Sequence, residues 1–201
     1  MWKITAFALI LAAGAAGCGG DDGVPPGDPT TDPLSAAERS ALVFTREEEK
    51  LARDVYGALA SNGQTFVNIG DSEQRHMDAI LTLLERYQVP DPAATTAVGE
   101  FVDPALQGLY RDLVAQGAPG SVDAFTVGCL IEELDLRDLD LARLDVTHAD
   151  VDATYASLAL GSRNHLRAFH GKLIAAGGSY QPQYLDQATF DAILASPHEQ
   201  P

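Results

Sequence analysis

Basic residues are few in this 201-residue chain: 13 Lys and Arg stand against 29 Asp and Glu, which gives a formal net charge of −16. No stripe of Lys or Arg and no nucleic-acid-binding module interrupts this acidity. Because such a charge repels the phosphate backbone of DNA or RNA, we exclude nucleic acid as a partner. The acidity otherwise indicates a soluble protein surface.

Aromatic residues are also sparse, at 7% of the chain with a single Trp, whereas 46% of the residues are apolar. These values are ordinary for a soluble globular protein. The chain is long enough, and apolar enough, for one domain with its own hydrophobic core.

The first 17 residues are predicted to be a signal peptide. Lys3 precedes an apolar run over residues 4–13 that is too short to span a membrane, and small residues follow it. The order Ala15-Ala16-Gly17-Cys18 resembles a bacterial lipobox, in which cleavage before the Cys leaves its sulfur and amino group carrying lipid. We therefore expect an exported protein that is anchored to the cell envelope, and its membrane, through lipid on Cys18. The alternative is a secreted protein in which Cys18 carries no lipid.

Cysteine is scarce as well, since Cys129 is the only one besides Cys18. If Cys18 is lipidated, no intramolecular disulfide can form, and stability has to come from packing or from packing plus a metal. Residues 18–34 are rich in Gly, Asp and Pro and cannot bury enough apolar area to offset their chain entropy. We expect a flexible tether there and a helical domain over residues 35–201.

Beyond the tether, apolar residues recur every three or four positions, which is the spacing of amphipathic helices. Capping residues, glycines and prolines bound the predicted segments. The predicted helices are 35–61, 65 to about 89, a short helix opened by Asp103 as cap and Pro104, one from 121, one capped by Thr147 and ending near 176, and a last small helix over 186–195.

Residues 134–144, whose leucines alternate at spacings of two and three, are interpreted as the frayed end of the third long helix. A 31-residue connection, 89–119, separates the second and third long helices. Four long helices with one long crossover that contains a short helix predict an all-α fold, a ferritin-like four-helix bundle.

A ferritin-like metal site takes a Glu from each of two helices and Glu-x-x-His from each of the other two. On the first helix, Glu49 shares the inward stripe with Tyr56. A charged group on such a stripe is costly to bury without a partner, so Glu49 is a candidate ligand. The alternative is a solvated Glu49 beside the equally exposed Glu47 and Glu48.

On the second helix, Glu73 and His76 are three residues apart and lie on one helix face, so that one cation could accept both side chains. Counted from the turn near residues 61–64, Glu49 and Glu73 lie at levels that agree to within one helical turn. The two helices thus point to the same site.

On the third helix, Glu132 is the preferred carboxylate ligand and Asp135 a further one, with Glu133 as the rival to Glu132 if the helix phase is slightly different. On the fourth helix, His165 stands where the scheme needs a His, but Ser162 stands where it needs a Glu. A core or surface His165 without metal is the alternative. The levels of Glu132 and His165 agree less well.

Four phrases of the chain carry a resemblance to a known family. They are "EEEKLARDVY", "FVNIGDSEQRHMDAILTLLERY", "FTVGCLIEELDLRDL" and "LGSRNHLRAFHGKL", which together resemble an uncharacterised prokaryotic family of ferritin-like proteins, domain of unknown function 2202. The first two are also similar to motifs of rubrerythrins, which implies Glu49, Glu73 and His76 as metal ligands. The resemblance implies a fold and metal binding rather than a reaction.

Two functions from different classes follow. The first is a di-iron or mixed-metal centre for oxygen or peroxide chemistry, with Tyr56 as a hydrogen-bond donor or electron relay and Ser162 beside the ligands. Its electrons would come from a separate redox or envelope protein, because the chain has no Cys cluster. The alternative is a non-catalytic lipoprotein that binds a partner or sequesters zinc or manganese. A purely structural bundle is a third reading, and the sequence leaves a homo-oligomer open.

Overall fold

The computed structural model describes residues 32–200, in which all regular structure is helical and no strand occurs. The all-α prediction is confirmed. Within these residues, no helix combines the length and apolar character that crossing a membrane requires. The predicted signal peptide, Cys18 and most of the tether lie outside the described residues. The helices are α1 Ala36–Ala58, the 3-10 helix η1 Ala60–Asn62, α2 Gln64–Arg86, α3 Pro104–Gly117, α4 Ser121–Arg143, α5 Ala149–Ala175 and α6 Gln187–Ala195.

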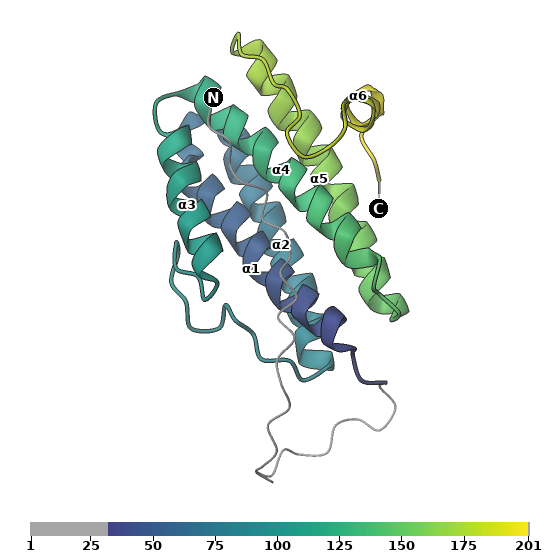
Figure 1. Ribbon diagram of the computed structural model, residues 1–201. Helices are drawn as coiled ribbons and strands as arrows, with labels where there is room; N and C mark the ends of the chain where they lie inside the picture. The colour runs from purple at the N-terminus through teal and green to yellow at the C-terminus, as the bar shows by residue number, and fades with distance from the viewer. Residues whose placement is uncertain (1–31, 201) are drawn as a thin grey trace. The chain divides into compact units, whose positions relative to one another are not determined.

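Four long helices form a bundle of two hairpins, α1 with α2 and α4 with α5 (Figure 1). Helix α2 also packs on α5, and α1 on α4. Ser121, which begins α4, donates to Asn62 just before α2, with 3.3 Å between Oγ and Oδ1. The N–H of Thr147, just before α5, donates to Glu38 at the start of α1. Helices α2 and α4 therefore run in the same direction, and the chain returns along the bundle between them.

The segment from residue 87 to residue 120 makes this return. It contains α3, which packs on α1 and α4 (Figure 1). Asp103 caps α3 as expected, since its Oδ1 accepts from the N–H groups of Ala105 at 2.7 Å and Leu106 at 3.3 Å. Pro104 follows as the first helical residue, where its missing N–H costs nothing.

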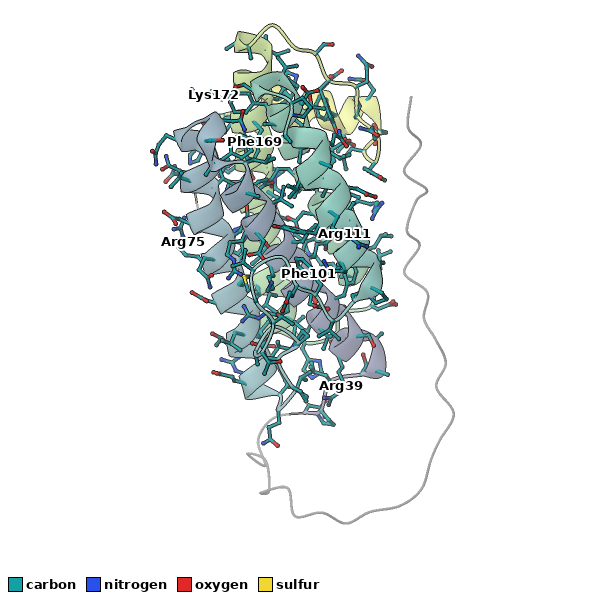
Figure 2. All side chains as sticks on the ribbon, turned by 90° about the vertical axis from the view of Figure 1, so that its left-hand side faces the viewer. Arg39, Arg75, Phe101, Arg111, Phe169 and Lys172 are labelled. Carbon is teal, nitrogen blue, oxygen red and sulfur yellow. The ribbon has the colours of Figure 1, made fainter. Side chains whose placement is uncertain are left out.

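Buried charges on α1 hold the returning segment in place. Lys50 is 2% exposed, and its Nζ donates to the carbonyl oxygens of Ala97 at 2.7 Å and Glu100 at 3.0 Å and to Asp54 at 2.7 Å. The Nζ also lies 4.4 Å from the ring centroid of Phe101, whose position is marked in Figure 2. Such a contact between a cation and a ring is favourable.

Arg46 and Glu47 of α1 also hold this segment. Together with Lys50 and Asp54 they form what we call the crossover clamp. Arg46 binds Asp91 through two hydrogen bonds of 3.0 Å. Glu47 accepts from the backbone N–H groups at positions 102 and 103, at 2.6 and 3.0 Å. Arg75, in contrast, lies on the outer face of α2 and points away from the bundle (Figure 2).

Three sequence predictions about helix ends are corrected. The first long helix ends at Ala58, and residues 60–62 form the separate 3-10 helix η1. Residues 134–143 are regular helix rather than a frayed end, because buried Leu136 and Leu139 pack into the bundle. The cap of α5 is His148 rather than Thr147, because the hydroxyl and N–H of Thr147 both bond Glu38.

Candidate metal centre

The carboxylate of Glu73, 2% exposed on α2, lies between two imidazoles. Its Oε2 is 2.8 Å from Nδ1 of His76, and its Oε1 is 2.8 Å from Nδ1 of His165. The first imidazole comes from the next turn of α2 and the second from α5. The two oxygens of one carboxylate therefore face two different ring nitrogens.

A second carboxylate flanks each imidazole. Glu49 of α1 places Oε2 at 3.1 Å from Nδ1 of His76, and Glu132 of α4 places Oε2 at 3.5 Å from Nδ1 of His165. Two clusters result, Glu49–Glu73–His76 and Glu73–Glu132–His165, and in each the three ligand atoms lie within 4.8 Å of one another. We call the two clusters together the centre; they share Glu73.

The spacing of these atoms suits cations. Ligand atoms about 2.1 Å from an ion are about 3.0 Å apart at neighbouring octahedral positions and about 3.4 Å apart at tetrahedral ones. The four carboxylate-to-imidazole distances run from 2.8 to 3.5 Å. Carboxylate and imidazole are also the ligand types that iron, zinc and manganese accept.

Several polar atoms at the centre are buried without a hydrogen-bond partner. They are Oε1 of Glu49, Oε1 of Glu73, Oδ1 of Asp135 and Nδ1 of His165. Nδ1 of His165 is close to Glu73, but the geometry is not that of a hydrogen bond. A buried polar atom without a partner is costly and uncommon in native proteins. Bound cations would satisfy the atoms of Glu49, Glu73 and His165, which belong to the two clusters, so the residues present fit a metal group.

Asp135 brings a fourth carboxylate to the centre, one helical turn after Glu132 on α4. It is 5% exposed, and its Oδ2 accepts a short hydrogen bond from the hydroxyl of Ser162. Ser162 occupies the position at which the sequence pattern requires a carboxylate. Its hydroxyl instead binds the carboxylate of Asp135, which comes from the neighbouring helix α4. The four carboxylates carry the charge that would balance two divalent ions with both imidazoles neutral.

The electrostatics of the metal-free centre reflect crowding of like charges. Burial and the charges of Glu132 and Glu73 raise the pKa of Asp135 to about 7. Burial and the charge of Asp135 likewise raise the pKa of Glu49 well above its ordinary value, despite His76 nearby. Without metal, some of these carboxyl groups therefore hold protons at neutral pH.

Glu73 behaves in the opposite way. Burial opposes its ionisation, but the charges of His165 and His76 outweigh burial and hold the pKa of Glu73 well below its usual range. Burial also opposes protonation of His165, yet the charges of Glu73 and Glu132 raise the pKa of His165 to about 10. The same balance, with Glu73 and Glu49, raises the pKa of His76. Without metal, the two imidazoles therefore hold protons at the ring nitrogens that would bind cations.

Tyr56 adjoins the centre from α1, as the sequence predicted. Its hydroxyl donates to Oε1 of Glu132 at 2.5 Å. The ring is fully buried, with centroids 5.0 Å from Phe169 and 6.0 Å from Phe66. Burial and the nearby charge of Glu132 raise the pKa of Tyr56, so it stays protonated and orients this carboxylate.

The structure separates Glu132 from its rival Glu133. The side chain of Glu133 is fully buried, but it accepts from the hydroxyl of Tyr180 at 2.5 Å and from the backbone N–H groups of residues 183–185. It holds the segment before α6 against α4 and takes no part in the centre. The sequence phase that placed Glu132 inward is the one observed.

The alternative of a solvated first-helix triplet is wrong, because Glu47, Glu48 and Glu49 are 3%, 7% and 1% exposed. Glu132 and His165 meet despite their uneven levels. Glu132 lies 11 residues before the last residue of α4, and His165 lies 16 after the first residue of α5. At 1.5 Å per residue the difference is about 8 Å, yet Oε2 of Glu132 lies 3.5 Å from Nδ1 of His165.

Residues 38–197 match the family described as "Uncharacterized protein domain (DUF2202)". The chain is 43% identical over 169 residues to "Uncharacterized protein MJ0754" of Methanocaldococcus jannaschii, which covers 83% of this chain and 91% of that protein. The crystal structure of the hypothetical protein MJ0754 superposes with a TM-score of 0.82 at 41% identity, covering 89% of this chain and 100% of that one. The chain therefore belongs to the DUF2202 family.

Proposed function

We propose that this protein is a ferritin-like metalloprotein that binds two divalent metal ions, with iron as the first choice, inside its helical bundle. The observation that carries the proposal is Glu73, a buried carboxylate whose two oxygens each face a separate Glu and His pair. A single mononuclear site would not need a second cluster with its own carboxylate and imidazole. The two hairpins joined by a long crossover support the ferritin-like assignment.

Each residue of the centre has a distinct task in this proposal. Glu49 and His76 would hold one ion, Glu132 and His165 the other, and Glu73 would bridge them. Asp135 would add the carboxylate that α5 lacks, while Ser162 orients it by a hydrogen bond. Tyr56 fixes the rotamer of Glu132. When bound, iron supplies the one-electron chemistry with which dioxygen or peroxide can be reduced.

Metal content tests this proposal. The purified protein, loaded with Fe²⁺ without oxygen and freed of excess ion, should hold two irons per chain by elemental analysis. Glu73→Ala should hold none, whereas Glu85→Ala, an exposed Glu on the same helix, should hold two. A wild-type protein without stoichiometric iron, zinc or manganese would contradict the proposal.

A second function, metal sequestration without catalysis, is favoured by Ser162. The two ligand clusters contain three carboxylates and not Asp135. If Asp135 stays with Ser162 and does not bind the ions, the centre has less negative charge than oxidised iron would need. The two functions separate when the Fe²⁺-loaded protein is exposed to dioxygen. Oxidation of the bound Fe²⁺ much faster than in buffer supports oxygen chemistry. Equal rates, together with tighter binding of Zn²⁺ or Mn²⁺, support sequestration.

We further propose that the protein is exported and held at the cell envelope by lipid on Cys18, with electrons supplied by a partner protein. This rests on the N-terminal sequence alone. Expression of the full chain and of Cys18→Ser, followed by cell fractionation, tests it. The wild type should sediment with membranes and the variant should not. If the wild type and the variant divide equally between the membrane and soluble fractions, Cys18 does not carry a lipid anchor.

A further inference from the structure

Gly161 on α5 lies against the imidazole of His76 on α2. A Cβ at position 161 would lie 2.6 Å from Nε2 and 2.8 Å from Cε1 of that ring, closer than real Cβ contacts occur. Its distance to Cε1 of His165, 3.8 Å, would be an ordinary contact. The absent side chain of Gly161 is therefore space that the His76 ring occupies.

The ring of His76 is held on three sides. Its Nδ1 faces Glu49 at 3.1 Å and Glu73 at 2.8 Å. Its face stacks on His165, with centroids 5.5 Å apart and planes inclined by 26°. The adjoining edge, with Cε1 and Nε2, meets the backbone of α5 at Gly161. Moving that edge outward would swing Nδ1 away from the two carboxylates.

Gly161 and His165 are four residues apart and share one face of α5. This face of α5 places the imidazole of His165 in the centre. One turn earlier, it places Gly161, which has no side chain, against the imidazole of His76. This lets α5 approach α2 closely enough for both histidines to reach Glu73. A side chain at 161 would have to tilt His76 or separate the two helices.

We propose that Gly161 is a positioning residue that sets the spacing of the two imidazoles, and so of the two metal positions. The inference rests on the proposed dinuclear centre. A glycine inside a helix is not by itself evidence, since Gly171 on the same helix would place a Cβ with nothing within 4 Å. Ala is favoured over Gly in such open helical positions, so Gly171→Ala is a matched control.

The test compares Gly161→Ala with Gly171→Ala, each also combined with His76→Ala. Co²⁺ binding is followed by visible absorption and elemental analysis, and thermal unfolding is measured in a chelator. Gly161→Ala should weaken the ion at Glu49–Glu73–His76 on the order of 10- to 100-fold, the usual cost of disturbing ligand orientation, and retain the ion at Glu73–Glu132–His165. Gly171→Ala should bind two ions with an unchanged spectrum.

Without metal, Gly161→Ala should unfold at a lower temperature than the wild type, and His76→Ala should remove this difference because it removes the ring that the Cβ meets. Two ions bound by Gly161→Ala with wild-type affinity and spectrum would overturn the inference. Loss of both ions, with no rescue of unfolding by His76→Ala, would also overturn it. A wild type that binds no Co²⁺ would contradict the dinuclear centre instead, while the unfolding comparison still tests the contact.

Discussion

Helix α1 buries two sets of charged side chains, one in the crossover clamp and one in the centre. Lys50 of the clamp uses all three of its donors, on Asp54 and on two carbonyl oxygens. Asp54 in turn accepts from Lys50, Arg53 and the N–H of Gly99. Glu49, one residue before Lys50, is equally buried, but its Oε1 has no partner.

The clamp has one buried atom without a partner, Nη1 of Arg46, but this is a donor and cannot bind a cation. The unpartnered acceptor oxygens of the centre are what mark a binding site. A buried carboxylate alone does not, since Glu47 and Glu133 are also buried and accept hydrogen bonds from two and three backbone N–H groups, respectively. Such groups stabilise a fold. The centre instead gathers four carboxylates and leaves three of them with an unpartnered oxygen. The acceptor atoms of the centre that have no hydrogen-bond partner, rather than burial alone, indicate a bound cation.

Lys50→Met should show the largest effect on stability. The substitution keeps the shape of the side chain and removes its charge from a buried ion pair. The free energy of unfolding should fall by about 3 kcal/mol. The loss should not be larger, because Asp54 keeps Arg53 as a partner. Denaturant unfolding in a chelator measures it. The number of bound ions should stay at two. Loss of metal with unchanged stability would remove the distinction between clamp and centre.

Glu49→Gln should do the reverse. It keeps the shape and lacks only the charge, so the stability of the metal-free protein should change by about 1 kcal/mol or less. Affinity for the ion at Glu49–Glu73–His76 should fall by more than about 100-fold, because a direct ligand contributes more than its outer partners. Isothermal titration with Co²⁺ checks this. Two ions bound as tightly as in the wild type would exclude Glu49 as a ligand.

Moving the fourth carboxylate between helices should give a smaller change. Asp135→Ser should weaken metal binding about tenfold, because it removes one charge and the partner of Ser162. Adding Ser162→Glu to this variant returns a carboxylate from α5 and should restore most of the affinity. Asp140→Asn, at an exposed position of α4, is the control. If the double variant binds no better than Asp135→Ser, Asp135 does not substitute for a residue on α5.

The affinity for metal should also depend on pH. Both imidazoles hold protons in the metal-free protein, since the pKa of His165 is raised to about 10 and that of His76 is also raised. Metal binding must release these protons, so affinity should rise with pH, about tenfold per unit for each proton released. Titration of Co²⁺ between pH 6 and pH 9 should show it, and an affinity independent of pH would contradict it.

The stability of the metal-free protein should respond to pH in the opposite direction. His165 has a raised pKa, so its contribution is fully present below its unfolded value of about 6.5 and is lost as pH rises toward about 10. Thermal unfolding in a chelator should therefore occur at lower temperature at pH 9 than at pH 6. The effect should be smaller in His165→Ala, because His76, whose pKa is also raised, still contributes.

Local patterns in the sequence were enough to predict which side chains of α1 and α2 face the centre, but not the burial of Glu47, Glu48 and Lys50. Glu49, Glu73 and His76 lie on adjacent helices joined by a short turn, so counting residues from that turn places them at one level. The periodicity of α4 also favoured Glu132 over Glu133. These are features of single helices and of one tight hairpin, where neighbouring residues determine geometry.

Features that depend on distant contacts were not predictable. Lys50 is buried by a carbonyl 47 residues away, and Thr147 is drawn from its capping role by Glu38, 109 residues away. Gly161 left no local signal, because its importance comes from a ring on another helix. Periodicity identifies which face of a helix turns inward but not which distant group will meet it.

Anomalous diffraction from crystals of the Fe²⁺- or Mn²⁺-loaded protein would locate the bound ions. We expect two anomalous peaks, one beside Glu49 and His76 and one beside Glu132 and His165, each within about 2.0 to 2.2 Å of a different oxygen of Glu73. A single peak, or two peaks that do not share Glu73, would contradict the dinuclear centre.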